Sequence, residues 1–239
     1  MKIKEMDAVS LQHVTRKYKR DNFEVRALDD VTLTISEHSF VAIMGPSGSG
    51  KTTMLNLITG VDHPTSGQVS VGNEEITGMN ENELSDWRAR HIGLVFQFYN
   101  LIPVLTAFEN VELPLLLTDL PEADRKTHVE AALEAVGLAD RMKHYPRQLS
   151  GGQEQRVVIA RAIVTDPTIV VADEPTGDLD AKSAEEILTL LTELNQRHKK
   201  TIVMVTHDSR AERFVDTTFR LDKGVFVGAE NSLVGGGRP

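Results

Sequence analysis

The stretch from Phe40 to Thr52 constrains the fold of this chain more than any other part of it. An unbroken apolar run over residues 40–44 ends where the pattern G-x-x-x-x-G-K-[ST] begins, and helical spacing follows from residue 51. Such a run suits a parallel strand that is buried on both faces. A glycine-rich loop between a strand and a helix is the context that separates a phosphate-binding loop from a chance match.

This loop predicts specific contacts to a nucleoside triphosphate, most simply ATP. Its residues are Gly45, Pro46, Ser47, Gly48, Ser49, Gly50, Lys51 and Thr52, followed by Thr53. The backbone N–H groups of residues 47–51 and the positive end of the helix would surround the β-phosphate. Lys51 would reach the β- and γ-phosphates, and the Thr52 hydroxyl would bind Mg²⁺. The alternative is a glycine-rich turn with an exposed lysine.

A phosphate loop alone does not distinguish a kinase, a GTPase and an ATPase. No Asn-Lys-x-Asp sequence occurs in the chain, so the usual guanine-reading motif is missing. Two further apolar runs, over residues 168–172 and 201–205, end at Asp173 and at His207. Ligands in open parallel sheets lie beyond the carboxyl ends of the strands, so we expect these side chains to converge on the loop.

The alternation of strand and helix signals predicts an α/β fold with a mostly parallel sheet. Helical spacing covers residues 51–59, 153–165 and 180–197, between the apolar runs. Short antiparallel strands are expected within residues 9–35 and 68–72, and a hairpin turn at residues 222–224. We therefore expect one domain over residues 1–239, with its parts as follows: a catalytic core over 1–98 and 151–228, an inserted helical subdomain over about 99–150, and a flexible glycine-rich tail over 229–239.

Composition excludes several classes of protein. The chain has no cysteine, so neither disulfides nor thiolate metal sites are possible. Its net charge of −9 argues against nucleic acid as a partner. The sequence shows no signal peptide and no apolar run near the roughly 20 residues that span a bilayer. We expect a cytoplasmic protein that reaches a membrane only through a partner.

Two adjacent acids, Asp173 and Glu174, follow the second apolar run. Successive strand residues face opposite sides, so the two carboxylates would take different roles. Asp173 would hold Mg²⁺, and Glu174 would accept a proton from the water that attacks the γ-phosphate. The pair favours hydrolysis over transfer to a second substrate. Alternatively, both acids only cap the turn over residues 175–177.

A second candidate anion site lies at the start of the helix near residue 153. Ser150 is a good N-cap, and the two glycines after it leave backbone N–H groups accessible: the segment is Ser150, Gly151, Gly152 and Gln153. One γ-phosphate does not need two helix N-termini from one chain, and the motif alone is weak, because a simple helix cap would look the same.

Together these residues resemble the nucleotide-binding subunits of ATP-binding-cassette (ABC) transporters, over nearly the whole chain. The segment over 149–153 resembles the family's signature sequence, which Arg156 and residues 160–162 continue. Tyr18 is similar to the aromatic that stacks on adenine, Gln97 to the glutamine that senses Mg²⁺ and the membrane partner, and His207 to the switch histidine on the γ-phosphate. Residues 177–180 resemble a loop at the dimer contact. Read alone, Tyr18 could be a strand-end aromatic, Gln97 a polar strand terminus and His207 a capped surface histidine.

The resemblance implies a P-loop NTPase core with an N-terminal antiparallel β subdomain and an inserted helical subdomain. It implies ATP and Mg²⁺ as cofactors, with Thr52, Gln97 and Asp173 around the metal and Lys51, Gln97, Glu174 and His207 in catalysis. It also implies that two copies bind head to tail, so that Ser150 to Gln153 act in trans. One departure is that residues 36–39, before the phosphate-loop strand, lack the family's usual glycine.

The stretch over residues 96–114 resembles the subfamily that serves macrolide export, lipoprotein release and related envelope tasks. The apolar residues after Gln97 would contact an integral membrane permease, encoded separately, on the cytoplasmic face of the membrane; they are Phe98, Tyr99, Leu101 and Ile102. Alternatively, they form a buried helix–loop contact. The rival functions are a soluble ABC-type ATPase in repair, translation or assembly, and a regulatory module without turnover. The transported substrate cannot be read from the sequence.

Overall fold

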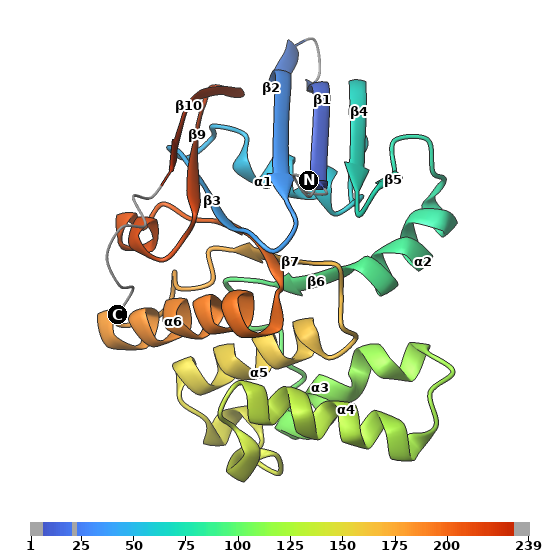
Figure 1. The fold of residues 1–239 in the computed structure, drawn as a ribbon, viewed down its shortest axis with the longest axis vertical. Helices are drawn as coiled ribbons and strands as arrows, with labels where there is room; N and C mark the ends of the chain where they lie inside the picture. Colours follow the sequence, from blue (N-terminus) through green and yellow to red (C-terminus); the bar gives the residue numbers. More distant parts are fainter. Residues whose placement is uncertain (1–6, 21–22, 232–239) are drawn as a thin grey trace, which may run out of the picture.

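The computed structural model describes residues 7–20 and 23–231, which form two β-sheets and a layer of helices (Figure 1). The strands are β1 (Asp7–Arg20), β2 (Phe23–Ser36), β3 (Phe40–Met44), β4 (Ser66–Val71), β5 (Glu74–Glu75), β6 (Ile92–Val95), β7 (Ile169–Asp173), β8 (Thr201–Val205), β9 (Thr217–Asp222) and β10 (Val225–Asn231). The α-helices are α1 (Lys51–Ile58), α2 (Glu81–His91), α3 (Ala107–Glu112), α4 (Glu122–Ala135), α5 (Gly151–Ile163) and α6 (Ala181–His198). The short 3₁₀ helices are η1 (Leu113–Leu117), η2 (Ala139–Arg141), η3 (Pro146–Gln148) and η4 (Ser209–Arg213).

The larger sheet has six strands in the order β10-β9-β3-β8-β7-β6. Its neighbouring strands are parallel except for the pair β9 and β10, which the hairpin predicted at residues 222–224 connects. The prediction of an α/β fold with a mostly parallel sheet is therefore confirmed. Strand β3 has β8 on one side and β9 on the other, so the loop after β3 starts from the middle of the sheet.

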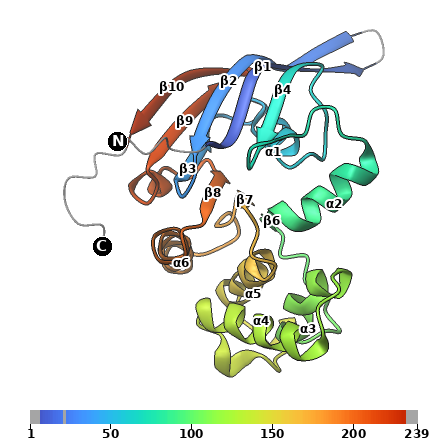
Figure 2. The same ribbon diagram turned by 45° about the vertical axis from the view of Figure 1, so that its right-hand side comes forward.

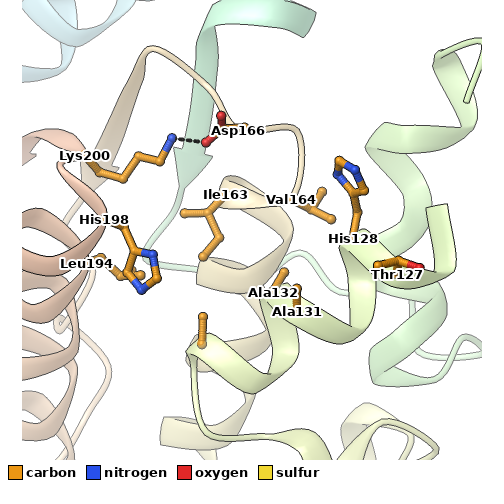
Figure 3. A pocket seen from close by; sticks show the side chains of 11 residues that line it. Thr127, His128, Ala131, Ala132, Ile163, Val164, Asp166, Leu194, His198 and Lys200 are labelled. Atoms are coloured by element: carbon orange, nitrogen blue, oxygen red, sulfur yellow. Dashed lines mark hydrogen bonds and ion pairs between the residues drawn. The ribbon is translucent and has the colours of Figure 1, made fainter. Parts of the chain in front are cut away.

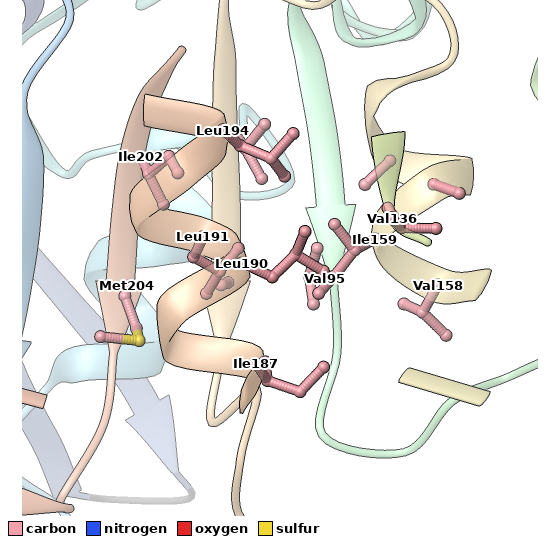
Figure 4. Packing of buried hydrophobic residues seen from close by; sticks show 14 of the residues in the cluster. Val95, Val136, Val158, Ile159, Ile187, Leu190, Leu191, Leu194, Ile202 and Met204 are labelled. Carbon is pink, nitrogen blue, oxygen red and sulfur yellow. The ribbon is translucent and has the colours of Figure 1, made fainter. Parts of the chain in front are cut away.

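The central strands are apolar throughout because both of their faces are buried. In β8, Ile202 and Met204 pack in one hydrophobic cluster, with helices α5 and α6, whereas Val203 and Val205 pack in the cluster on the other face. Side chains alternate between the faces of a strand, so each face needs its own apolar residues. Figure 4 shows the first cluster, where Leu191 and Leu194 of α6 lie near Ile202.

The second sheet is antiparallel, with strand order β2-β1-β4-β5. Strands β1 and β2 are 14 residues each, longer than the short strands that the sequence predicted for this region. Their inner side chains share one hydrophobic cluster with helix α1, the buried Trp87 of α2 and the other face of the six-stranded sheet. Helix α1, which follows the phosphate loop, is thereby held between the two sheets.

The helical layer consists of α3, α4 and the 3₁₀ helices η1, η2 and η3, with α5 packed against both α3 and α4. Figure 2 shows these helices together on the side of the six-stranded sheet away from the antiparallel one. Helix α3 begins with a capping box in which Thr106 and Glu109 exchange hydrogen bonds, and α5 begins with the same arrangement at Ser150 and Gln153. Because of this cap, α5 begins at residue 151 rather than at the predicted 153, and it ends at Ile163 rather than at residue 165.

The expected tail over residues 229–239 begins too early. Strand β10 continues to Asn231, since Ala229, Glu230 and Asn231 pair with residues 217–219 of β9. The alternation of apolar side chains stops before these residues because most of β10 is exposed, so only backbone pairing holds its end. The rest of the expected tail, residues 232–239, lies outside the described residues.

The turn between β2 and β3 lacks the glycine that is usual in the family, and His38 takes the left-handed backbone conformation there. The φ angle of His38 is 63°, in the left-handed region that favours glycine. Its backbone N–H donates to the Thr201 hydroxyl (2.8 Å), and its ring Nδ1 lies 2.6 Å from the Lys199 carbonyl oxygen. These contacts to the start of β8 hold the strained conformation, so the departure from the family pattern leaves the turn intact.

Candidate nucleotide site

The phosphate loop connects β3 to α1 through backbone contacts that need glycine. A Cβ on Gly45 would lie 2.0 Å from the Leu221 carbonyl oxygen, and a Cβ on Gly50 would lie 2.4 Å from the Ala27 carbonyl oxygen. Gly48 has a φ of 79° and nothing within 4 Å of a Cβ position, so this part of the loop faces open space. The loop is packed on its outer side and accessible on its inner side, as a cradle for an anion requires.

Lys51 and the start of α1 make this cradle positive. The Lys51 ammonium donates to the carbonyl oxygens of Gly45 (2.8 Å) and Pro46 (3.0 Å), which holds it across the loop. Helix α1 has Gly50 at its N-cap and no side-chain cap, so its first N–H groups are not satisfied by a capping side chain. The helix dipole and the ammonium therefore act on the same space.

A pocket of about 730 Å³ opens over this loop. Most of the predicted site residues line it; they are Gly45, Pro46, Ser47, Gly48, Gly50, Lys51, Thr52, Thr53, Gln97, Asp173, Glu174 and His207. Ser49 is buried beneath the loop instead, with its hydroxyl among the buried polar atoms that have no hydrogen-bond partner in the described part of the chain. The predicted convergence of the loop with Asp173 and His207, at the ends of two other strands, is therefore present in the structure, and Gln97 after β6 joins them.

A further side of this pocket could not be predicted from the sequence. Val25, Arg26 and Ala27 of β2 also line it. Tyr18, which is similar to an adenine-stacking aromatic, pairs with Val25 across the hairpin but is not among the lining residues. The Tyr18 hydroxyl donates to Asp62 (2.6 Å), and the Arg16 guanidinium lies 4.6 Å from the centre of its ring. Stacking of Tyr18 on adenine therefore stays a prediction.

Asp173 ends β7 in a partly buried position opposite Lys51. Burial raises the pKa of its carboxyl above the ordinary value, the Glu174 carboxylate raises it further, and Lys51 partly offsets both effects. A divalent cation beside this carboxylate would favour its ionised form. Asp173 is thus suited to hold a cation that arrives with the phosphates.

The oxygen donors in this pocket suit Mg²⁺. Thr52 offers a hydroxyl, Asp173 a carboxylate and Gln97 an amide oxygen, because the Gln97 amide nitrogen is engaged in a 3.0 Å hydrogen bond to Asp178. No group of three or more His, Cys, Asp or Glu that could hold a metal ion occurs within residues 7–20 and 23–231. Mg²⁺ does not need such a cage, since it binds through one or two protein ligands together with substrate phosphates and water.

Glu174 and His207 form a hydrogen-bonded pair at the pocket. Oε1 of Glu174 lies 2.8 Å from Nδ1 of His207, and the His207 backbone N–H donates to Oε2 over 3.4 Å. Glu174 has a φ of 48°, and its own N–H donates to the Val205 carbonyl oxygen of β8. The left-handed backbone turns Glu174 away from the path of β7, so the two acids face different surroundings.

The segment Ser150 to Gln153 lies outside this pocket, at the start of α5. The Ser150 hydroxyl accepts a hydrogen bond from the Gln153 backbone N–H, and the Gln153 amide oxygen accepts one from the Ser150 N–H. A Cβ on Gly151 would lie 2.9 Å from the Tyr99 hydroxyl, and one on Gly152 would lie 3.4 Å from Ser183. Of the two helix N-termini predicted as anion sites, that of α1 therefore lines the nucleotide pocket and that of α5 does not.

The glycine loop, the acid pair beside it and the parallel sheet that brings them together define a phosphate-loop nucleoside triphosphatase. The ABC transporter family profile matches residues 28–177 of this chain. The ABC transporter ATP-binding protein YtrE of Bacillus subtilis is 42% identical over 225 residues, which cover 92% of this chain and 97% of that protein. The chain therefore belongs to the ABC transporter family, as an ATP-hydrolysing cassette.

Two further relatives are a longer protein that includes a permease and a cassette of known structure. The macrolide export ATP-binding/permease protein MacB of Bradyrhizobium diazoefficiens is 42% identical over 219 residues, which are 92% of this chain but 33% of that protein. The cassette MJ0796 of Methanocaldococcus jannaschii has been solved as a dimer in a post-hydrolysis state bound to ADP and Pi. That structure has a TM-score of 0.84 and 44% identity, and the match covers 93% of this chain and 98% of that one.

Proposed function

We propose that two copies of this chain close head to tail around ATP, hydrolyse it and thereby drive an integral membrane permease, in export, lipoprotein release or other envelope work. The observation that carries this proposal is the separation of the two helix N-termini. One lines the pocket with Lys51, and the other, at Ser150, lies outside it in the same chain. A second copy related by two-fold symmetry can place its Ser150 segment over the first copy's pocket, and the reverse.

Hydrolysis needs little covalent chemistry from the protein. A water attacks the γ-phosphorus, Glu174 accepts the water's proton, and the bond between the γ-phosphorus and the bridging oxygen breaks to release ADP. Lys51 and the α1 N-terminus stabilise negative charge on the phosphate oxygens, while His207 fixes the Glu174 carboxylate through the 2.8 Å contact. Mg²⁺, held by Thr52, Gln97 and Asp173, would supply further charge neutralisation between the β- and γ-phosphates.

The Glu174→Gln variant tests both the base and the dimer. It keeps the shape of the side chain but cannot take a proton, so ATP binding should persist while steady-state hydrolysis falls by about a hundredfold or more. The dimer should then accumulate in the presence of Mg²⁺ and ATP, measured by light scattering behind a sizing column. Hydrolysis at the parent rate would refute the role of Glu174, and a monomer with bound ATP would refute the closed dimer.

The membrane partner is proposed from apolar side chains that the helical layer exposes. Phe98 is 70% exposed and Leu117 is 84% exposed, and Ile102, Val104 and Leu116 are exposed as well. Of the four residues expected to be exposed here, Tyr99 and Leu101 are instead partly buried against the core, so the predicted exposure is wrong for these two. The buried side chain of Asn110 holds the loop between Ile102 and Thr106 through four hydrogen bonds, which fixes the exposed Ile102 and Val104 in place.

Attachment to the cytoplasmic face of a membrane would depend on that permease. No helix among the described residues is both long enough and apolar enough to cross a bilayer. The relative MacB combines an ATP-binding and a permease part, and this chain matches the ATP-binding share of its length. Purification of this chain from detergent-solubilised membranes should recover a permease; recovery of soluble partners alone would favour an ABC-type ATPase of repair, translation or assembly.

A further inference from the structure

A second pocket, of about 440 Å³, lies at the opposite end of the parallel strands. It is bounded by α4 on one side and, on the other, by the segments that lead from α5 into β7 and from α6 into β8 (Figure 3). It shares no lining residue with the nucleotide pocket. Strand β7 separates them, and its 5 residues span about 17 Å at the usual rise per residue. The second pocket is therefore a distinct site.

The floor of this second pocket is apolar because α4 presents small side chains there. Ala131, Ala132 and Ala135 lie on one side, opposite Ile163 and Val164 after α5 and Leu194 of α6. The hollow left by the alanines gives the second pocket a volume within the usual range of small-molecule sites, which are mostly apolar with a few placed polar groups. A ligand here would need an apolar body.

The polar end of the second pocket contains the Lys200 ammonium, whose partner Asp166 can be replaced by another carboxylate. The Lys200 side chain is 15% exposed and forms an ion pair with Asp166, whose side chain is 85% exposed. Lys200 also donates to the Pro167 carbonyl oxygen over 3.3 Å. The largely buried Lys200 ammonium therefore needs an anionic partner, whereas the exposed Asp166 can turn into water once another carboxylate takes its place.

The hydrogen-bond donors around the second pocket suit an anion. Two further basic side chains, His128 of α4 and His198 of α6, line it, and Asp166 is the one carboxylate in the lining. Figure 3 shows His128 on the α4 side and Lys200 joined to Asp166 across the opening. A carboxylate that enters this space would meet Lys200 as a charged donor, with both imidazoles as further hydrogen-bond donors.

We propose that the second pocket binds a small amphipathic carboxylate. The carboxylate takes the place of Asp166 on Lys200, and the apolar body lies along the alanine face of α4. Such a ligand contacts the helical layer and the corner before β8 at once, so it connects two parts of the molecule away from the ATP site.

The test measures binding of octanoate and, as the uncharged control of equal length, octanol, by titration calorimetry on the whole chain. Octanoate should bind more tightly than octanol. Lys200→Met, which keeps an unbranched side chain one atom shorter and without the charge, should weaken octanoate binding by about tenfold and leave octanol binding unchanged. Asp166→Asn should raise the affinity for octanoate several-fold, since it removes the competing carboxylate. Asparagine also tolerates the left-handed backbone at this position, where φ is 55°.

Ala131→Leu controls for the location of binding. Ala131 is exposed at the edge of the second pocket, so leucine fills the hollow without entering the core. This variant should lose octanoate binding but keep the ATP affinity of the parent chain, which reports that it is folded. The proposal is overturned if octanoate does not bind, or if Lys200→Met and Asp166→Asn leave its affinity unchanged.

Discussion

At the scale of single residues, Asp173 places a charge in a partly buried position that disfavours it. Its pKa is raised mainly by burial, so its ionised form destabilises the folded chain at pH values above the folded-state pKa. Asp173→Asn removes this charge and should raise stability in the absence of nucleotide at about pH 7.5, while it weakens binding of Mg²⁺ with ATP. The stability gain should shrink as the pH falls through the raised pKa, because the parent carboxyl then becomes neutral as well.

Urea unfolding of both chains at about pH 7.5 and about pH 5 measures this effect. A variant less stable than the parent at the higher pH would show that the Lys51 attraction outweighs burial.

Most single residues of the nucleotide pocket could be predicted from the sequence because their roles follow from local order along the chain. Gly45 to Thr53 are consecutive, and Asp173, Glu174 and His207 each follow an apolar run. Val25 to Ala27 could not be predicted, since their contact with the pocket depends on how the antiparallel sheet packs on the other one. The Glu174–His207 hydrogen bond could not be predicted either, because it joins residues after two different strands and depends on the order of the strands in the sheet.

At the scale of elements, α6 ends at a lysine in the left-handed conformation, which lysine does not favour. Lys199, at the C-cap, has a φ of 54°, and its backbone N–H donates to the Leu194 carbonyl oxygen. A left-handed conformation costs an ordinary residue about 1–2 kcal/mol, and glycine is the usual residue there. Lys199→Gly should therefore raise the free energy of unfolding by about 0.5 kcal/mol after the entropy cost of glycine.

Lys199→Ala is the matched control, since it removes the same exposed side chain but keeps the Cβ. It should be no more stable than the parent chain in the same urea titration. Equal stability of the glycine and alanine variants would contradict the assignment of strain to this cap.

The elements differ in how well the sequence predicts them. The strands β3, β7 and β8 were predicted within a residue or two because burial on both faces leaves an unbroken apolar run. The end of β10 was missed because an exposed edge strand pairs through its backbone and needs no apolar pattern.

At the scale of the whole molecule, we predict that substitution of an exposed apolar side chain of the helical layer weakens binding to the permease and leaves the fold intact. Phe98→Ser should keep the ATP affinity and thermal stability of the chain, because the side chain is exposed. It should weaken capture of the permease by about tenfold if Phe98 is an anchor of the interface. Val227→Ser is a matched control, since Val227 is exposed on β10 and outside the helical layer. Equal loss in both variants would show a general effect of surface hydrophobicity.

The proposed composite ATP site belongs to two molecules, so a mixture of two variants tests it. Lys51→Ala and Ser150→Arg each remove one half, and each variant alone should be inactive as a symmetric dimer. In a heterodimer, one pocket combines the intact loop of one chain with the intact Ser150 segment of the other. An equal mixture should therefore recover about a quarter of the parent ATPase rate, if half of the dimers are mixed and the sites act independently. Were both halves to act within one chain, the mixture would stay inactive while sizing showed normal dimers.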